Sequence, residues 1–241
     1  MKSEDSGPRY RRILLKLSGE ALAGDGGSGI DPGVLSAIAG EIRDVQALGV
    51  QIGVVVGAGN LFRGRNAGEL GIPRVTGDQM GMLATVMNSL AIQSAIERLG
   101  VPARVMCPFN MKEIAEPYII RKALDHLVHG RVVIAAGGTG HPFFTTDTAA
   151  ALRAVELEAD LLLKATDVDG VYTGDPKKDR DARKFESMSY LDVLAGRLGV
   201  MDSTAVSLCM ENGMPIRVFN LFDRGSLEGI VSGKPIGTLI S

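Results

Sequence analysis

The sequence has 241 residues, 45% of them hydrophobic and 22% charged, which is enough to bury one good core in a globular protein. Its 26 basic and 28 acidic residues nearly balance, so we expect no nucleic-acid partner. Cys107 and Cys209 fit no metal or redox spacing, so we expect two core thiols in a cytoplasmic protein. The polar N-terminus lacks the apolar run of a signal peptide, and the uncharged stretches 45–62 and 79–96 contain too many polar or glycine residues for membrane spans.

Apolar runs rich in β-branched residues alternate with helical patterns along the chain. The runs predicted as strands span 13–17, 50–56, 103–107, 131–136, 160–165 and 216–220. The helical faces are marked first by Leu35, Ile38, Ile42 and Val45, then by Met80, Leu83, Met87, Leu90 and Ser94, then by Leu152, Val155 and Ala159, and last by Leu191, Leu194 and Leu198. This alternation predicts an α/β fold with a mostly parallel central sheet and helices on both faces. The charged, Gly- and Pro-containing stretch 173–186 is expected to be a loop.

Four of the predicted strands end in turns that could hold a ligand. Three turns are rich in glycine, with the sequences SGEALAGDGG, GAGNLFRG and GGTGHPFF, and the fourth reads TDVDGVY. One such turn is most simply a chain reversal. Four of them at the carboxyl ends of parallel strands favour a ligand site at that edge of the sheet.

Several common site motifs are excluded. Phe62 occupies the place where the dinucleotide-binding motif needs its third glycine, and no phosphate-binding GxxxxGK[ST] motif occurs. His126 and His129 have no cysteine or acidic cluster nearby in sequence, so we interpret them as surface or structural histidines. Neither cysteine has a histidine beside it in a known nucleophile motif.

Cationic residues at the predicted strand ends favour phosphoryl transfer. Lys16 and Lys164 each end an apolar strand, and Arg63 follows a glycine turn. These lysines could simply extend their amines to water. Asp147 could simply cap a helix, or it could hold both lysines in place. Phosphoryl transfer requires positioning and charge stabilisation more than covalent chemistry, and lysines with glycine-turn amides supply both. A phosphate acceptor, whose second pKa is about 6, would need no general base.

Six segments resemble the signatures of the bacterial UMP kinases, which are a branch of the amino acid kinase family. They are ILLKLSGEAL, VVVGAGNLFRG, GDQMGMLATVMN, GTGHPFFTTDTAA, KATDVDGVYTGDP and MPIRVFN, and the likeness runs from Tyr10 to the C-terminus. The resemblance implies a three-layer sandwich that transfers the γ-phosphoryl group of ATP to UMP with Mg²⁺. It also implies a homohexamer activated by GTP and inhibited by UTP. One domain over 1–241 is expected, with acceptor binding in roughly 1–155 and ATP binding in roughly 156–241.

The resemblance also assigns roles to residues. Catalytic roles fall to Lys16, Arg63, Asp147 and Lys164. ATP contacts fall to Lys16, Leu17, Ser18, Gly19, Gly59, Arg63, Thr166, Tyr172 and Asp175. UMP contacts fall to Ala58, Asp78, Thr139, Gly140, His141, Pro142, Phe143, Phe144, Thr145 and Thr146. Ala58 and His141 depart from the family's usual glycine and asparagine, and the glycine-rich stretch 24–29 corresponds to an effector-linked loop.

Alternatives remain at several positions. Phe143 and Phe144 would wall the base from water, although one of them could pack into the core. Asp78 would contact the ribose hydroxyls, or it could cap a helix that begins at Gln79. The uncharged helix 79–96 is apolar on several sides, so we expect it to pack against its twin in another subunit. A related kinase with a carboxylate or carbamate acceptor and a non-catalytic nucleotide-binding protein are the rival functions.

Overall fold

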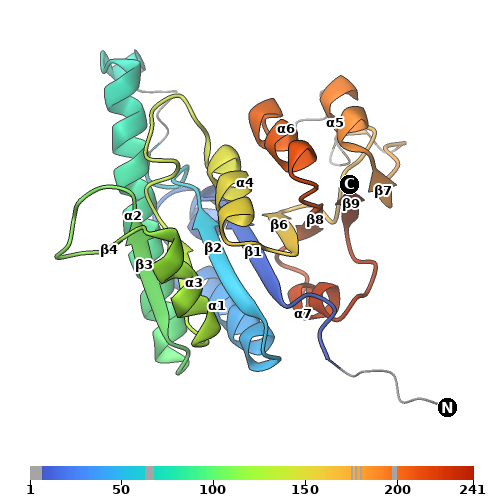
Figure 1. The fold of residues 1–241 in the computed structure, drawn as a ribbon. Coiled ribbons are helices and arrows are strands. Elements are labelled where there is room, and N and C mark those ends of the chain that lie inside the picture. The colour runs from blue at the N-terminus through green and yellow to red at the C-terminus, as the bar shows by residue number, and fades with distance from the viewer. Residues whose placement is uncertain (1–6, 63–67, 175, 177, 180, 197–199) are drawn as a thin grey trace.

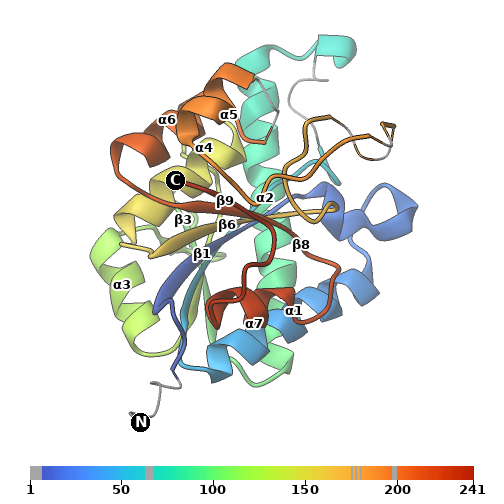
Figure 2. The same cartoon turned by 90° about the vertical axis from the view of Figure 1, so that its right-hand side faces the viewer.

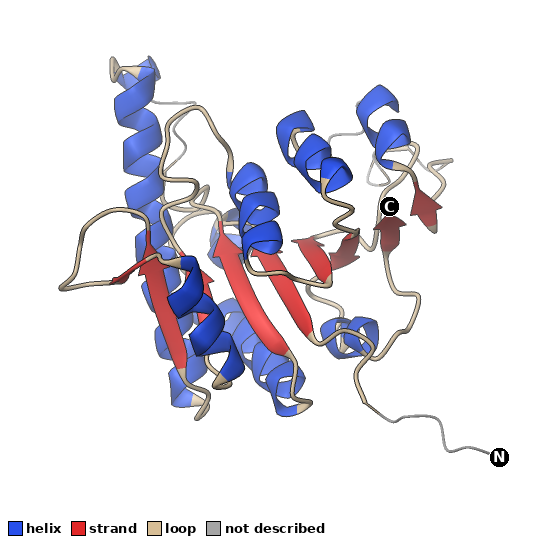
Figure 3. Ribbon diagram, viewed as in Figure 1, coloured by secondary structure: helices blue, strands red, loops and turns tan. Residues whose placement is uncertain are grey.

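The structure is a computed structural model that describes residues 7–62, 68–174, 176, 178–179, 181–196 and 200–241. Its nine described strands form one sheet in the order β4-β3-β5-β2-β1-β6-β8-β9-β7 (Figures 1 and 3). They are β1 (Arg12–Leu17), β2 (Gln51–Val56), β3 (Ala103–Cys107), β4 (Glu116–Pro117), β5 (Val132–Ala135), β6 (Leu161–Thr166), β7 (Ser187–Met188), β8 (Ile216–Asn220) and β9 (Thr238–Ile240). All paired strands run parallel except β8 and β9, so the predicted mostly parallel sheet is confirmed.

Helices cover both faces of the sheet (Figure 2). One face carries the 3₁₀ segment η1 (Glu20–Gly26) and the helices α1 (Pro32–Ala47), α2 (Arg74–Arg98) and α7 (Ser226–Val231). The other carries α3 (Ile120–Val128), α4 (Thr146–Glu156), α5 (Tyr190–Gly196) and α6 (Ser203–Glu211). None of the described helices is long and apolar enough to cross a membrane.

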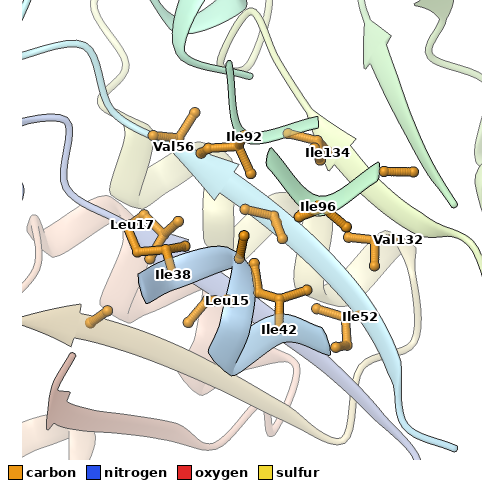
Figure 4. Close-up of a cluster of buried hydrophobic side chains, with 14 of the residues drawn as sticks. Leu15, Leu17, Ile38, Ile42, Ile52, Val56, Ile92, Ile96, Val132 and Ile134 are labelled. Atoms are coloured by element: carbon orange, nitrogen blue, oxygen red, sulfur yellow. The ribbon is translucent and has the colours of Figure 1, made fainter. Parts of the chain in front are cut away.

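Each central strand buries side chains on both faces because successive residues point to opposite sides. On β1, Leu15 and Leu17 join the cluster under α1 and α2, whereas Leu14 joins the cluster under α4. Figure 4 shows part of the first cluster, where Ile42 of α1 and Ile96 of α2 pack over the sheet. Fully burying a side chain of this size contributes about 1.5–3 kcal/mol. The two clusters therefore hold the sheet rigidly between its helical layers.

The predicted helices exist, but the predicted face of α2 is not the buried one, and the faces predicted for α4 and α5 are buried only in part. On α2, Leu83 and Met87 are 52% and 58% exposed, and the side toward the core contains Ile92 and Ile96 together with small and polar residues. On α4 the alanines are buried, whereas Leu152 and Val155 are only partly buried. Leu191 of α5 is exposed, and Leu198 lies outside the described residues. Hydrophobicity alone could not select the buried side of α2, because large apolar residues occur on both sides of this helix.

Candidate active site

Two buried lysines lie side by side where β1 and β6 end. Lys16 and Lys164 are register partners on these adjacent parallel strands. Asp147, in the first turn of α4, approaches both amines. Its Oδ1 lies 2.6 Å from the Nζ of Lys16, and its Oδ2 lies 2.7 Å from the Nζ of Lys164. All three side chains are at most 15% exposed. The lysines therefore end on a carboxylate rather than in water, and the alternative of two water-seeking lysines is wrong.

Burial and charge shift the pKa values of this cluster. Burial alone would raise the pKa of Asp147, but Lys16 and Lys164 together outweigh it and lower that pKa. Burial lowers the pKa of Lys164, partly offset by Asp147, and the neighbouring Lys16 lowers it further. Lys164 also donates to the carbonyl of Val200. With both lysines protonated, the cluster carries a net positive charge, which suits an anionic ligand.

Thr145, not Asp147, is the N-cap of α4. Its hydroxyl accepts from the backbone amides of Asp147 and Thr148 at 3.0 and 3.2 Å. The interpretation of Asp147 as a helix cap is therefore wrong, and its carboxylate is free for the two lysines. The amino end of α4 adds the partial positive charge of the helix dipole to the same place.

Asp202 links α4 to α6 and was not among the candidates identified from the sequence. Its carboxylate accepts from the hydroxyl of Thr145 and, at 3.0 Å, from that of Thr148. The same carboxylate caps α6 by accepting from the amide of Ala205 at 3.0 Å. Asp202 thus fixes the start of α4, and with it the place of Asp147.

A cavity of about 430 Å³ opens beside this cluster, between α2 and the loop 137–145. Seven of the ten predicted UMP contacts line it, namely Ala58, Asp78, Thr139, His141, Phe144, Thr145 and Thr146. Gly140, Pro142 and Phe143 do not. Phe143 and Phe144 are 66% and 52% exposed, so the alternative that one packs into the core is wrong.

Asp78 reaches across this cavity to the loop. It lies inside α2, four residues after the helix begins at Arg74, so the alternative that it caps a helix starting at Gln79 is wrong. Its carboxylate accepts from the Nε of Arg74 at 2.8 Å and from the amide of Phe143 at 2.8 Å. Phe143 has a positive φ of 72°, a conformation that costs a bulky residue energy. Asp78 therefore helps to hold the loop in an unfavourable backbone conformation.

The first two glycine turns touch each other. A Cβ on Gly19 would lie 2.5 Å from the amide nitrogen of Gly59, and one on Gly57 would lie 2.9 Å from the amide nitrogen of Gly19. Only glycine permits this approach of two backbones. Gly59 lines the 430 Å³ cavity together with Ala58.

Two further cavities, of about 620 and 980 Å³, lie on the opposite side of the lysines. Lys164 and Thr166 line both of them. Of the other predicted ATP contacts, Lys16 and Ser18 line the larger cavity and Tyr172 lines the smaller one. The side chain of Leu17 is fully buried, so only its backbone could face a ligand. Gly59 lines neither cavity, and Arg63 and Asp175 lie outside the described residues.

The 430 Å³ cavity, which Asp78 lines, and the 980 Å³ cavity, which Ser18 lines, share one lining residue, Glu20. Glu20 was not among the candidates identified from the sequence. Gly24 and Asp25, from the predicted effector-linked stretch, also line the larger cavity. Two ligands could thus meet beside Lys16, Asp147 and Lys164, one from each side.

Comparison with known proteins identifies the family. Residues 11–220 match the amino acid kinase family over most of the chain. The chain belongs to the amino acid kinase family. The family expected from the six sequence segments is confirmed.

Solved structures of kinases in this family are similar over nearly the whole chain. A UMP kinase from Bacillus anthracis is 40% identical, with a TM-score of 0.93 and 96% of each chain covered. A UMP kinase from Ureaplasma parvum is 34% identical, with a TM-score of 0.90, 97% of this chain and 99% of that chain covered. A uridylate kinase from Archaeoglobus fulgidus is 29% identical, with a TM-score of 0.70, 95% of this chain and 99% of that chain covered.

Residues outside the cavities have structural roles in this kinase. His126 lies 3.0 Å from Glu116 and 3.0 Å from Arg131, as expected of a structural histidine. Both cysteines are free and buried, which confirms their interpretation as core thiols. Arg153 is buried, lies 3.9 Å from the Tyr118 ring centroid and donates to the carbonyl of Gly138 at 3.3 Å.

Proposed function

We propose that the protein is a UMP kinase, which transfers the γ-phosphoryl group of ATP to UMP and yields UDP and ADP. The observation that carries the proposal is the cluster of Lys16, Asp147 and Lys164 between an acceptor-sized cavity and a second set of cavities. The UMP kinases that match nearly the whole chain support UMP as the acceptor.

The two lysines would act on the transferred group. Phosphoryl transfer spreads negative charge over the oxygens of that group, and fixed cations placed at this point stabilise the transition state. Lys16 and Lys164 are held in place by Asp147, so they need no rearrangement during the reaction. The acceptor phosphate is largely ionised at neutral pH, so no side chain has to remove a proton.

UMP would occupy the cavity between α2 and the loop 137–145. Threonine hydroxyls and the turn amides at Ala58 and Gly59 offer donors to uracil and phosphate. An ionised carboxylate has about four acceptor positions, so Asp78 can bind a ribose hydroxyl while it holds Arg74 and Phe143. The acceptor part would then be roughly residues 1–155, and the ATP part roughly residues 156–241, except for the β1 turn.

Mg²⁺ would be carried by the phosphates of ATP. No group of three or more His, Cys, Asp or Glu that could hold a metal ion occurs among the described residues. Mg²⁺ typically keeps several waters and binds to substrate phosphates with only one or two carboxylates, so the residues present fit such an ion. The metal would neutralise phosphate charge, and the lysines would contact the remaining oxygens.

The exposed apolar stripe of α2 supports a homohexamer in which this helix packs against its twin. Met80, Leu83 and Met87 are all exposed on one side of the helix. GTP as activator, UTP as inhibitor and a cytoplasmic place in pyrimidine nucleotide biosynthesis follow from the likeness to UMP kinases. Buried free cysteines are consistent with a reducing compartment.

An acceptor comparison tests the proposal. ADP release is measured with UMP, CMP, dUMP and carbamate at equal concentrations, with ATP and Mg²⁺ in excess. UMP should give the highest kcat/KM. Faster turnover of carbamate would favour the related kinases, and no acceptor-dependent ADP release, with tight nucleotide binding, would favour a non-catalytic binding protein.

A further inference from the structure

The side of α2 that faces the sheet contains three buried polar residues. Thr85 is 2% exposed, and Asn88 and Ser89 are fully buried. Buried polar groups are costly unless hydrogen-bonded, so their partners show what they are for. Thr85 and Asn88 belong to the segment GDQMGMLATVMN, in which Asp78 is so far the only residue with a role at the acceptor cavity.

Thr85 holds the turn that follows β5. Its hydroxyl donates to the carbonyl of Met82 at 2.6 Å and accepts from the amide of Gly137 at 2.8 Å. Gly137 has a φ of 74°, and a Cβ there would lie 2.9 Å from the sulfur of Cys107. Gly137 and Gly138 have no side chains to anchor this turn, so neighbouring elements orient it, through Thr85 at Gly137 and through Arg153 at the carbonyl of Gly138.

Asn88 holds the turn that follows β2. Its amide nitrogen donates to the carbonyl of Gly57 at 2.8 Å and to the Oδ1 of Asn60 at 2.8 Å. Asn60 returns a bond to the Oδ1 of Asn88 at 3.1 Å and donates to the carbonyl of Gly29 at 2.6 Å. Gly57 leads directly into Ala58 and Gly59, which line the acceptor cavity.

Thr85 and Asn88 are three positions apart, so they lie on the same side of one helix. Through them, a single rigid element holds the turn before Ala58 and the turn before Gly138 and Thr139. These two turns form facing parts of the acceptor cavity. Displacement of reacting groups by about 1 Å can cost on the order of 100-fold in rate, so their relative placement matters for transfer.

We propose that Thr85 and Asn88 are positioning residues of the acceptor site, which set the two glycine turns relative to each other through hydrogen bonds from α2. The assignment of UMP as the acceptor rests on the proposed function above. Thr85 itself lines the acceptor cavity, Asn88 lies behind it on Gly57, and neither residue lines the two cavities assigned to ATP. Their loss should therefore impair the use of the acceptor and spare the affinity for ATP.

The test compares kcat/KM for UMP and KM for ATP in Thr85→Val, Asn88→Ala, Thr85→Ser and Ser89→Ala. Thr85→Val keeps the side-chain shape but removes the hydroxyl oxygen that accepts a hydrogen bond from the Gly137 amide. Thr85→Ser keeps that hydroxyl. Ser89→Ala is the matched control, because Ser89 is equally buried and its hydroxyl donates only within the helix, to the carbonyl of Thr85 at 2.7 Å. Each variant's melting temperature is measured alongside.

We expect kcat/KM for UMP to fall about tenfold or more in Thr85→Val and Asn88→Ala, with KM for ATP within twofold of wild type. Thr85→Ser should recover most of the loss, and Ser89→Ala should lower only the melting temperature. The proposal is overturned if Thr85→Val behaves like Ser89→Ala. If Thr85→Val fails to fold, Asn88→Ala decides by the same criterion. A wild-type protein that prefers another acceptor would contradict the proposed function. In that case kcat/KM for that acceptor, compared among the same variants, would still decide the role of Thr85 and Asn88.

Discussion

Replacing Asp147 with asparagine removes the charge between two buried lysines. The amide is nearly the same size as the carboxylate, so packing of α4 should change little. Lys16 and Lys164 would then face each other as register partners on adjacent strands without a counter-charge. We expect a large loss of stability and a loss of turnover, because the lysines would no longer be held charged in place.

The size of the stability loss can be bounded in two ways. Removing one partner of a buried ion pair costs about 3–5 kcal/mol. The protein can instead deprotonate one lysine, and at pH 7, which is 3.5 pH units below the ordinary lysine value of 10.5, this costs at most about 4.8 kcal/mol at 1.36 kcal/mol per unit. Both routes give about 3–5 kcal/mol. For a chain of this length that corresponds to about 6–20 °C in melting temperature.

The dependence on pH gives a sharper test. In the wild type the lowered pKa of Asp147 means that its contribution is present above the ordinary carboxyl value near 3.8 and is lost as pH falls through the folded pKa. The variant lacks this acid-side loss. Burial and the neighbouring Lys16 lower the pKa of Lys164 and would no longer be offset by Asp147, so the folded variant binds fewer protons than the unfolded chain as pH approaches 10.5. Its stability should therefore rise toward alkaline pH.

Urea unfolding of wild type and variant between pH 2 and 10 measures both effects. Asp44→Asn is the control, because Asp44 pairs with Arg43 at 2.7 Å but both side chains are nearly half exposed. That change should stay within about 0.5 kcal/mol. A loss below about 1 kcal/mol in Asp147→Asn, with no alkaline recovery, would refute the account of the lysine cluster.

Three further outcomes follow from the proposed site. Lys16→Met and Lys164→Met should each lower kcat by more than tenfold with little change in KM for UMP, since both lysines meet charge that develops in the transition state; a change in KM alone would contradict this. Asp78→Asn should weaken UMP binding by about 1.5–3 kcal/mol and leave kcat largely intact. If Asp78 binds the 2′-hydroxyl, the variant should also discriminate less against dUMP than the wild type does, and unchanged KM values would remove it from the site. Leu83→Glu with Met87→Glu should split the oligomer in sedimentation, and a monomeric wild type at micromolar concentration would end the proposal for α2.

The central strands and the lysine pair could be predicted from sequence because their signals are local. Six apolar runs correspond to β1, β2, β3, β5, β6 and β8. The remaining described strands, β4, β7 and β9, have only two or three residues, too few to show a period. Lys16 and Lys164 stood out because a lysine within an apolar strand end is unusual. Their register partnership required the order of the strands, which no local pattern contains.

The supporting polar residues could not be predicted in the same way. Thr85, Asn88 and Asp202 act on backbone or side chains that are 31 to 57 positions away in the sequence. Small polar residues inside a helix or before one are usually read as solvent-facing or as caps, and Asp202 is indeed also a cap. Thr85 and Asn88 share the buried side of α2 with Ile92 and Ile96, whereas the predicted face of Met80, Leu83 and Met87 is exposed, so the hydrophobic pattern drew attention to the other side of the helix.

The proposed reaction is tested most directly by following the γ-phosphoryl group itself. The protein is incubated with γ-labelled ATP, Mg²⁺ and UMP, and the nucleotides are separated. The account predicts label in the β-phosphate of UDP, formed in equal amount to unlabelled ADP and at a rate more than tenfold lower in Lys164→Met. Label that appears in inorganic phosphate at the same rate with and without UMP would contradict it.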